Sequence, residues 1–166
     1  MPRTEIELNP IDFITIGTIG PRGQRVFHLQ AGHEHKLISF TMEKEQAWAL
    51  SDAIREMLDN LDERFEETTE VELAGLDMDL REPIQPLFRI AQMGLAYEEE
   101  SGLIILVVQE LVPQNDEEED ESEEAGVVRM WCSREQMRAL SLHAAETVAQ
   151  GRPDPKMNGR ITYYWT

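Results

Sequence analysis

The chain has 166 residues, a length that suits one domain or two small halves with a shared core. Its apolar content of 41% is ordinary for a globular protein, but its formal net charge of −18 is not. Such an acidic surface repels phosphate groups, which argues against sequence-independent binding to nucleic acid and against docking on anionic membranes. One cysteine, no apolar run long enough to span a bilayer and no secretory signal together predict a cytoplasmic protein without an intrachain disulfide.

The N-terminal third predicts a small antiparallel sheet followed by a helix. Short runs rich in β-branched and aromatic residues are separated by turn-forming residues at 20–23 and 31–33. These runs predict strands over 13–19, 25–30 and 36–42. From residue 43 the apolar spacing changes to three and four, which predicts an amphipathic helix over 43–66. Its apolar stripe consists of Ala47, Leu50, Ile54, Leu58, Leu61 and Phe65.

The second half predicts the same order of elements. Residues 67–86 mix acidic residues with prolines and are interpreted as a connector, and strands are predicted over 87–94, 103–110 and 127–132. Ser133 and Gln136 have the spacing of a capping box, which starts a helix over 133–150 that ends before Gly151. Its stripe consists of Met137, Leu140, Ala144 and Val148. Residues 151–166 form a C-terminal tail in which 161–165 is compatible with a last strand.

An internal echo supports this duplicated plan. The residues Glu45-Gln46-Ala47-Trp48-Ala49-Leu50-Ser51 return ninety positions later as Glu135-Gln136-Met137-Arg138-Ala139-Leu140-Ser141. Self-similarity at a fixed offset is a signature of repeated structural units. The predicted fold is therefore α+β: two pseudo-repeated β-β-β-α units, 11–66 and 87–150, with two long amphipathic helices packed on mostly antiparallel sheet in one domain. We interpret the units as related by a pseudo-twofold axis.

Two loops invite a functional interpretation. Eight of the nine residues from Asp116 to Glu124 are acidic, and the loop 113–125 is interpreted as an open, self-repelling connection rather than a lure for basic partners or cations. The glycines of 17–23 suggest a phosphate loop, but this segment leads into a strand rather than a helix, so a hairpin turn is favoured.

The residues that could bind metal or react covalently have simpler structural explanations. His33 and His35 flank Glu34, and His28 lies one predicted strand away, but the spacing supplies no fourth ligand and no metal site is predicted. Cys132 matches Met42 in the repeat and alternates with Met130, which predicts a buried thiol rather than a reactive one. His143 has no neighbouring serine or acid with the logic of a catalytic triad. No catalytic residue and no cofactor are predicted.

The three tryptophans raise the question of a partner surface. Trp48 lies beside the first helical stripe without belonging to it, which predicts partial exposure. Trp131 alternates with Met130 and Cys132, so with Arg129 it lies on the opposite face of the sheet, which the connector, the C-terminal aromatic residues or a second subunit would cover. Trp48, Arg129 and Trp131 are the candidates for a partner surface, and intrachain packing is the alternative explanation.

Several of these segments resemble a known family. The pattern Phe13-x-x-x-Gly17-Thr18-Ile19-Gly20, then Gly23-Gln24-Arg25-x-Phe27, together with Phe88-Arg89-Ile90 and Gly151-Arg152-Pro153, is similar to an uncharacterised bacterial family common in Actinobacteria, number three-zero-nine-zero among the domains of unknown function. Members typically end in a cysteine-rich knuckle that looks like a zinc site. Residues 151–159 of this chain contain no cysteine, so the resemblance implies no zinc here.

Two classes of function are compatible with the sequence. The first is a non-enzymatic binding or assembly module that uses a sheet face or the cleft between the units to bind a protein or a small anionic ligand, with a homo-oligomer as an open alternative. The second is an enzyme or ligand-binding protein with an arginine-lined anion pocket between the units. Its candidate residues are Arg25, Gln30, Arg89 and Arg152, which are polar residues within the family-like segments. Arginine in particular suits carboxylate and phosphate recognition. A structure distinguishes the two classes. In the second class these four side chains surround one pocket, whereas scattered side chains leave only the first class.

Overall fold

The computed structural model describes residues 4–113 and 125–150, so the acidic run, Arg152 and the C-terminal tail lie outside the described residues. Its elements follow the order β-β-β-β-α, a short 3₁₀ turn, then β-β-β-α. The strands and helices are β1 (Glu5–Leu8), β2 (Phe13–Ile19), β3 (Val26–His33), β4 (Lys36–Met42), α1 (Lys44–Phe65), η1 (Leu73–Gly75), β5 (Pro86–Glu98), β6 (Leu103–Glu110), β7 (Val127–Cys132) and α2 (Arg134–Gln150).

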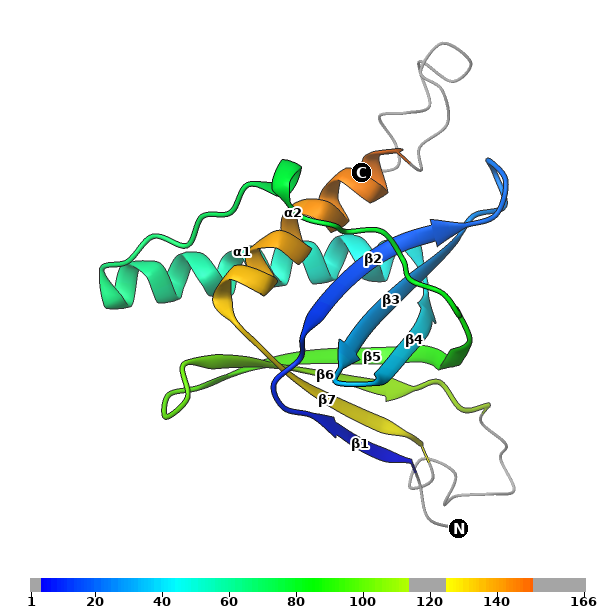
Figure 1. Ribbon diagram of the computed structural model, residues 1–166, viewed down its shortest axis with the longest axis horizontal. Helices are drawn as coiled ribbons and strands as arrows, with labels where there is room; N and C mark the ends of the chain where they lie inside the picture. The colour runs from blue at the N-terminus through cyan, green and yellow to red at the C-terminus, as the bar shows by residue number, and fades with distance from the viewer. Residues whose placement is uncertain (1–3, 114–124, 151–166) are drawn as a thin grey trace.

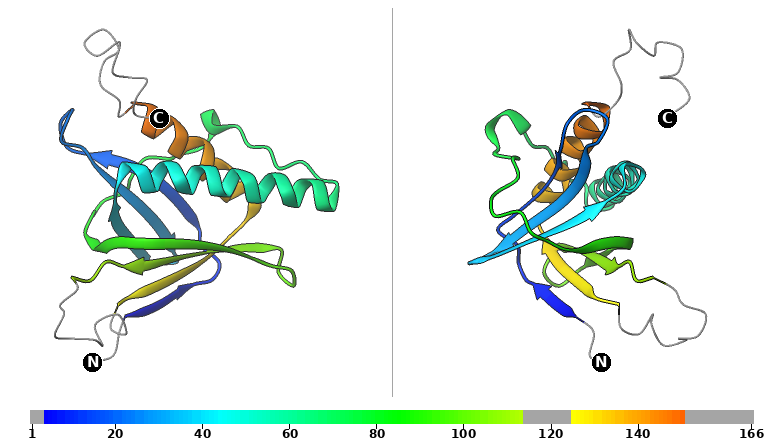
Figure 2. Two further views of the ribbon diagram at one scale, coloured as in Figure 1. Left: turned by 180° about the vertical axis from the view of Figure 1, so that it is seen from behind. Right: turned by 90° about the vertical axis from the view of Figure 1, so that its right-hand side faces the viewer.

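All seven strands belong to one sheet in the order β1-β7-β6-β5-β4-β3-β2. Two antiparallel meanders, β2-β3-β4 and β5-β6-β7, are joined by parallel pairing between β4 and β5. A second parallel pair connects β1 to β7. The sheet bends strongly, and both helices lie on the same side of it (Figures 1 and 2). The fold is α+β, as the sequence predicts.

The helices are positioned by their caps and by one shared core. Ser133 and Gln136 form the predicted capping box, in which the Gln136 amide donates to Ser133 Oγ at 3.0 Å and the Ser133 amide donates to Gln136 Oε1 at 2.8 Å. The predicted stripes are buried except for Phe65, which is 40% exposed. Phe65 belongs to the last turn of α1, and its ring lies beside the half-buried Tyr97 ring at a centroid distance of 6.0 Å. The stripe prediction is wrong at this one position.

Strand β1 has no counterpart in the sequence-based prediction. Glu5, Ile6, Glu7 and Leu8 alternate, with Leu8 fully buried, but such a short run next to Pro10 gives little signal. Strand β3 begins one residue later than predicted and continues to His33, and β5 continues to Glu98. The sheet is mostly antiparallel, as the sequence predicts, and its two parallel pairs join β1 to β7 and β5 to β4.

The connector between α1 and β5 covers the outer face of β2 and β3, the face turned away from the helices. Thr15 Oγ donates to Met78 O at 2.6 Å, and Gln30 exchanges two hydrogen bonds with the backbone of Arg81, at 2.9 and 2.7 Å. Leu80 approaches Gly17 so closely that a Cβ there would lie 2.7 Å from the Leu80 side chain. The connector is therefore a packed element of the fold.

The two meander-helix units match at several positions. Strands β4 and β7 each precede a helix and occupy equal places in their meanders: Ser39 pairs with Gln30, and Arg129 pairs with Val107. The buried residues Met42 and Cys132 end these two strands. These correspondences are compatible with duplication, and the pseudo-repeat itself stays a prediction. Among the described residues, neither helix has the length and apolarity that crossing a membrane requires.

Candidate functional site

A basic pocket of about 370 Å³ lies where the first unit meets β5. Four cationic side chains and two carboxylates line it, which gives the pocket a positive balance in a chain whose net charge is −18. The cationic residues are Arg22, Arg25, Lys44 and Arg89, and the acidic residues are Glu43 and Glu45. Positive charge is thus concentrated at one hollow of an acidic protein.

Three elements bring these side chains together. The β2–β3 turn projects Arg22 and Arg25, and its shape depends on Gly20 and Gly23, whose φ angles of 115° and 87° favour glycine. Strand β4 leads directly into α1, so Glu43, Lys44 and Glu45 lie at the start of that helix. Arg89 reaches the same hollow from β5, because Thr41 and Arg89 are partners in the parallel β4–β5 pair.

Only part of the positive charge in the basic pocket is compensated. Arg89 forms an ion pair with Glu43, and Arg25 Nη1 donates to Gln150 O at 3.4 Å. Arg22 forms no ion pair within the described ranges. The first turn of α1 adds the positive end of the helix dipole, which favours an anion near helix N-termini. The arrangement suits a carboxylate or phosphate group.

The structure separates the four candidate ligand-binding residues of the sequence. Arg25 and Arg89 line the basic pocket together. Gln30 is fully buried and is committed to Ser39 Oγ at 3.0 Å and to the Arg81 backbone, so it holds the connector. Arg152 lies outside the described residues. Arg22 and Lys44 are absent from the sequence-based prediction. Both have a sequence signal, because Arg22 lies in the glycine turn 20–23 and Lys44 follows the predicted strand 36–42 at a helix start.

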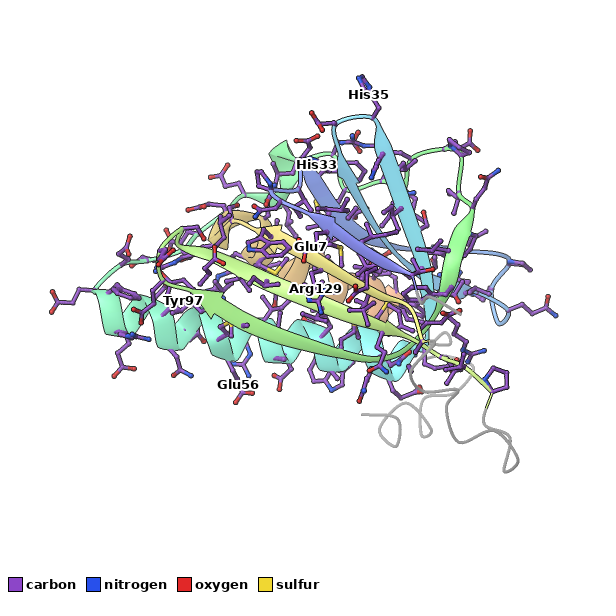
Figure 3. The ribbon with its side chains drawn as sticks, turned by 90° about the horizontal axis from the view of Figure 1, so that it is seen from below. Glu7, His33, His35, Glu56, Tyr97 and Arg129 are labelled. Atoms are coloured by element: carbon purple, nitrogen blue, oxygen red, sulfur yellow. The ribbon has the colours of Figure 1, made fainter. Side chains whose placement is uncertain are left out.

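The candidates for a partner surface do not form one surface. Arg129 lies on the sheet face turned away from the helices, with Nη1 at 3.9 Å from Glu5 and 3.8 Å from Glu7 (Figure 3). Trp131 lies on the same face and donates Nε1 to Glu98 Oε2 at 3.3 Å. Trp48 belongs to α1, on the other side of the sheet, and is 53% exposed.

A second, wider hollow of about 840 Å³ lies between the C-terminal half of α1, α2 and the segment 68–72. Three of its charged groups pair with one another: Arg138 Nη2 lies 3.1 Å from Asp59 and 3.4 Å from Asp62. Thr69 donates twice to Asp62. Burial alone would raise the pKa of Asp62, but the hydrogen bonds from Thr69 and the charges of Arg138 and Arg134 hold it below its usual value. These ion pairs connect α1 to α2, so the charged groups that form them have a structural role.

The environments of the thiol and the histidines indicate structural rather than catalytic roles. Cys132 is fully buried, and desolvation raises its pKa to about 12, which leaves an inert thiol. His28 Nδ1 lies 3.0 Å from Val26 O, whereas His33 Nδ1 lies 2.5 Å from Pro10 O, and His35 lies at the exposed turn (Figure 3). Over residues 4–113 and 125–150, no group of three or more potential ligands could hold a metal ion.

The fold and the basic pocket define a class: an α+β protein with seven strands in one bent sheet, two helices on one side, and a basic hollow at the junction of its two meanders. A family model for proteins of unknown function, DUF3090, matches residues 6–160, and the chain belongs to this family. No curated protein and no solved structure gives a significant match. The family assignment confirms the resemblance seen in the sequence.

Proposed function

We propose that this protein is a non-enzymatic cytoplasmic binding module that takes up an anionic group, a carboxylate or a phosphate, in the basic pocket. The observation that carries the proposal is the convergence of Arg22, Arg25 and Arg89 from two separate elements on one hollow. Arginine presents paired N–H donors that match the geometry of carboxylate and phosphate oxygens. The volume of about 370 Å³ suits a small ligand or the charged end of a larger one.

Binding rather than catalysis is favoured by the chemistry of the lining. The two carboxylates, Glu43 and Glu45, belong to the helix start, where Glu43 caps α1 and pairs with Arg89. Among the described residues of the lining, none is a histidine, cysteine or serine that would serve as a nucleophile or general base. An enzyme with its acid–base groups supplied by a partner is the second candidate, and only the positive pocket favours it.

Titration calorimetry with inorganic phosphate and with citrate tests the proposal. The variants are Arg22→Gln, Arg25→Gln and Arg89→Gln, and Arg55→Gln is the matched control because Arg55 pairs with Asp52 and Asp59 on α1. We expect each pocket variant to weaken binding by about tenfold, since a charge-assisted contact contributes about 1.4 kcal/mol or more. The control should change binding less than about twofold.

Two results would contradict the proposal. The first is that neither anion binds at about 10 mM and low ionic strength. A dissociation constant above that concentration is too weak for a built anion site. The second is equal loss of binding in Arg55→Gln and in the pocket variants, which indicates a general response to net charge. Turnover of a bound ester or phosphate would instead favour the enzyme alternative.

A further inference from the structure

Half of strand β5 has an open edge. Its N-terminal part pairs with β4 through Pro86, Phe88 and Arg89, and its remainder pairs with β6 from Ile90 to Glu98. From Gln92 onward, the edge opposite β6 therefore has no strand partner within the described part of the chain. Unpaired backbone groups on a strand edge are a template for an additional extended segment.

An apolar groove runs along this open edge. We call it the α1–β5 groove: it has a volume of about 330 Å³ and is lined by Gln46, Ala49, Leu50 and Ala53 of α1 and by residues 91–95 of β5. Ala49, Ala53 and Gly94 are exposed, and such small residues leave room for a polypeptide backbone between helix and strand. Gln46 closes one end by donating Nε2 to Ile90 O at 3.1 Å and Ala91 O at 3.2 Å.

The corresponding position in the other unit lies between α2 and β2, where the connector lines the hollow. Gln136 of α2 donates Nε2 to Ile11 O at 3.1 Å and Asp12 O at 3.4 Å, as Gln46 does at β5. The hollow between α2 and β2 has a third wall, which the connector supplies with Val71, Leu76 and Met78. The segment 76–80 reads Leu-Asp-Met-Asp-Leu, so apolar and acidic residues alternate. No described segment forms a third wall at the α1–β5 groove.

The charge around the α1–β5 groove determines what kind of segment fits there. Glu56 and Glu63 lie on the same helical row as Ala49, seven and fourteen positions beyond it, and both are exposed. Figure 3 shows Glu56 projecting from α1 into solvent. This acidic row and the net charge of −18 repel an acidic peptide and a second copy of the chain. They attract lysine and arginine.

We propose that the α1–β5 groove binds an extended cationic peptide segment of a partner protein, in which apolar residues alternate with lysine or arginine. Side chains of a strand point alternately to opposite sides, so the apolar set enters the groove while the basic set meets the acidic row. The backbone of the segment pairs with the open edge of β5. The connector provides the internal model for the apolar wall that such a segment would supply, although among the described residues the connector itself does not pair as a strand with β2.

Fluorescence anisotropy with a labelled peptide tests this proposal. The probe is Leu-Lys-Met-Lys-Leu-Lys-Val-Lys-Leu, and the control peptide has the same composition with its lysines in one block. We expect the alternating peptide to bind about tenfold more tightly than the block peptide. Ala53→Trp fills the groove and should weaken binding by about tenfold, whereas Ala149→Trp, at an exposed alanine of α2, should change it less than about twofold.

Equal affinity for the two peptides, equal effects of the two tryptophan variants, or no binding at about 1 mM would each overturn the proposal. A dimer in sedimentation equilibrium that Ala53→Trp converts to monomer would identify a second copy as the occupant and would also overturn it. The peptide site is independent of the basic pocket, so Arg25→Gln should leave peptide binding unchanged. A loss in that variant would show that the peptide uses the other site.

Discussion

Ser51 and Ser141 exchange reciprocal hydrogen bonds at the crossing of the two helices. Ser51 Oγ donates to Ser141 O and Ser141 Oγ donates to Ser51 O, both at 2.7 Å, and both residues are 4% exposed. Each buried hydroxyl thus finds its hydrogen-bond acceptor in the backbone of the other helix, in a region that excludes water. The small side chains let α1 and α2 approach closely, and each helix thereby contributes the same contact to the centre of the fold.

Because the two contacts are equivalent, Ser51→Ala and Ser141→Ala should destabilise the protein equally, by about 1 kcal/mol each. The hydroxyl is lost, but the accepting carbonyl remains part of its own helix. Ser51→Val should cost more, about 2 kcal/mol, because the added methyl groups separate the helices. Urea denaturation measures all three. A difference above about 1.5 kcal/mol between the two alanine variants would contradict the equivalence.

Gln46 and Gln136 perform a paired role at the helix starts. Each accepts a backbone N–H of its own cap and donates to backbone carbonyls of the opposite unit, Gln46 to carbonyls in β5 and Gln136 to carbonyls in the loop before β2. Gln→Glu at either position keeps the acceptor but replaces the donor with a charge beside carbonyl oxygens, so it should cost about 2 kcal/mol. The exposed Gln150→Glu should be nearly neutral. Equal unfolding midpoints for Gln136→Glu and Gln150→Glu would show that the donation to Ile11 contributes nothing.

The sequence predicts the two meanders and both helices because their residues give local signals. Leu50 and Leu140 repeat at helical spacing, and Cys132 alternates with Met130, so each position follows from periodicity. The echo of Gln46 in Gln136 marks the helix starts. Six of the seven strands were thereby located within a few residues of their ends, and the buried thiol was assigned correctly.

The parts that were missed depend on contacts between distant segments. Strand β1 exists because Leu8 pairs beside Met130, more than a hundred positions away. The sequence makes Gln30 a ligand-binding candidate, but the connector returns to cover it, and nothing near Gln30 in the sequence indicates this. The basic pocket needs the parallel pairing of β4 with β5, which brings Arg89 to the turn that carries Arg25.

Leu50 and Leu140 provide the test of the two buried helix faces. They are 4% and 0% exposed, and each occupies the same place in its helix. Leu50→Asp and Leu140→Asp should each destabilise the protein by about 4 kcal/mol or prevent folding, because a buried unpaired carboxylate is strongly unfavourable. Leu142→Asp is the control, since Leu142 is 42% exposed. Thermal unfolding of either core variant within a few degrees of Leu142→Asp would show that the stripe is not buried.

Asp62 connects α1 to α2 and to Thr69. Its contribution to the unfolding free energy should depend on whether its carboxyl group is ionised. Asp62→Asn keeps the shape but weakens the pairs with Arg134 and Arg138, so it should cost about 2 kcal/mol at pH 7. The pKa of Asp62 is depressed in the folded state, so this stability is present above its usual pKa near 3.8 and is lost as the pH falls through the folded value. The difference between wild type and variant should therefore shrink in acid. A constant difference from pH 7 to pH 3 in urea titrations would contradict the ionic role.

Cys132 makes stability depend on pH in the opposite direction. Burial raises the pKa of its thiol to about 12 from a reference of 9.0, so above pH 9 the unfolded chain releases a proton that the folded chain keeps. The thiol's contribution is complete below pH 9 and decreases by about 1.4 kcal/mol per pH unit as the pH rises toward 12. Cys132→Ala lacks this term, so its unfolding free energy should fall less between pH 8 and pH 10 than that of wild type. A thiol reagent should also react much faster in denaturant than with the folded protein. Equal pH profiles together with fast native labelling would show that Cys132 is exposed to water.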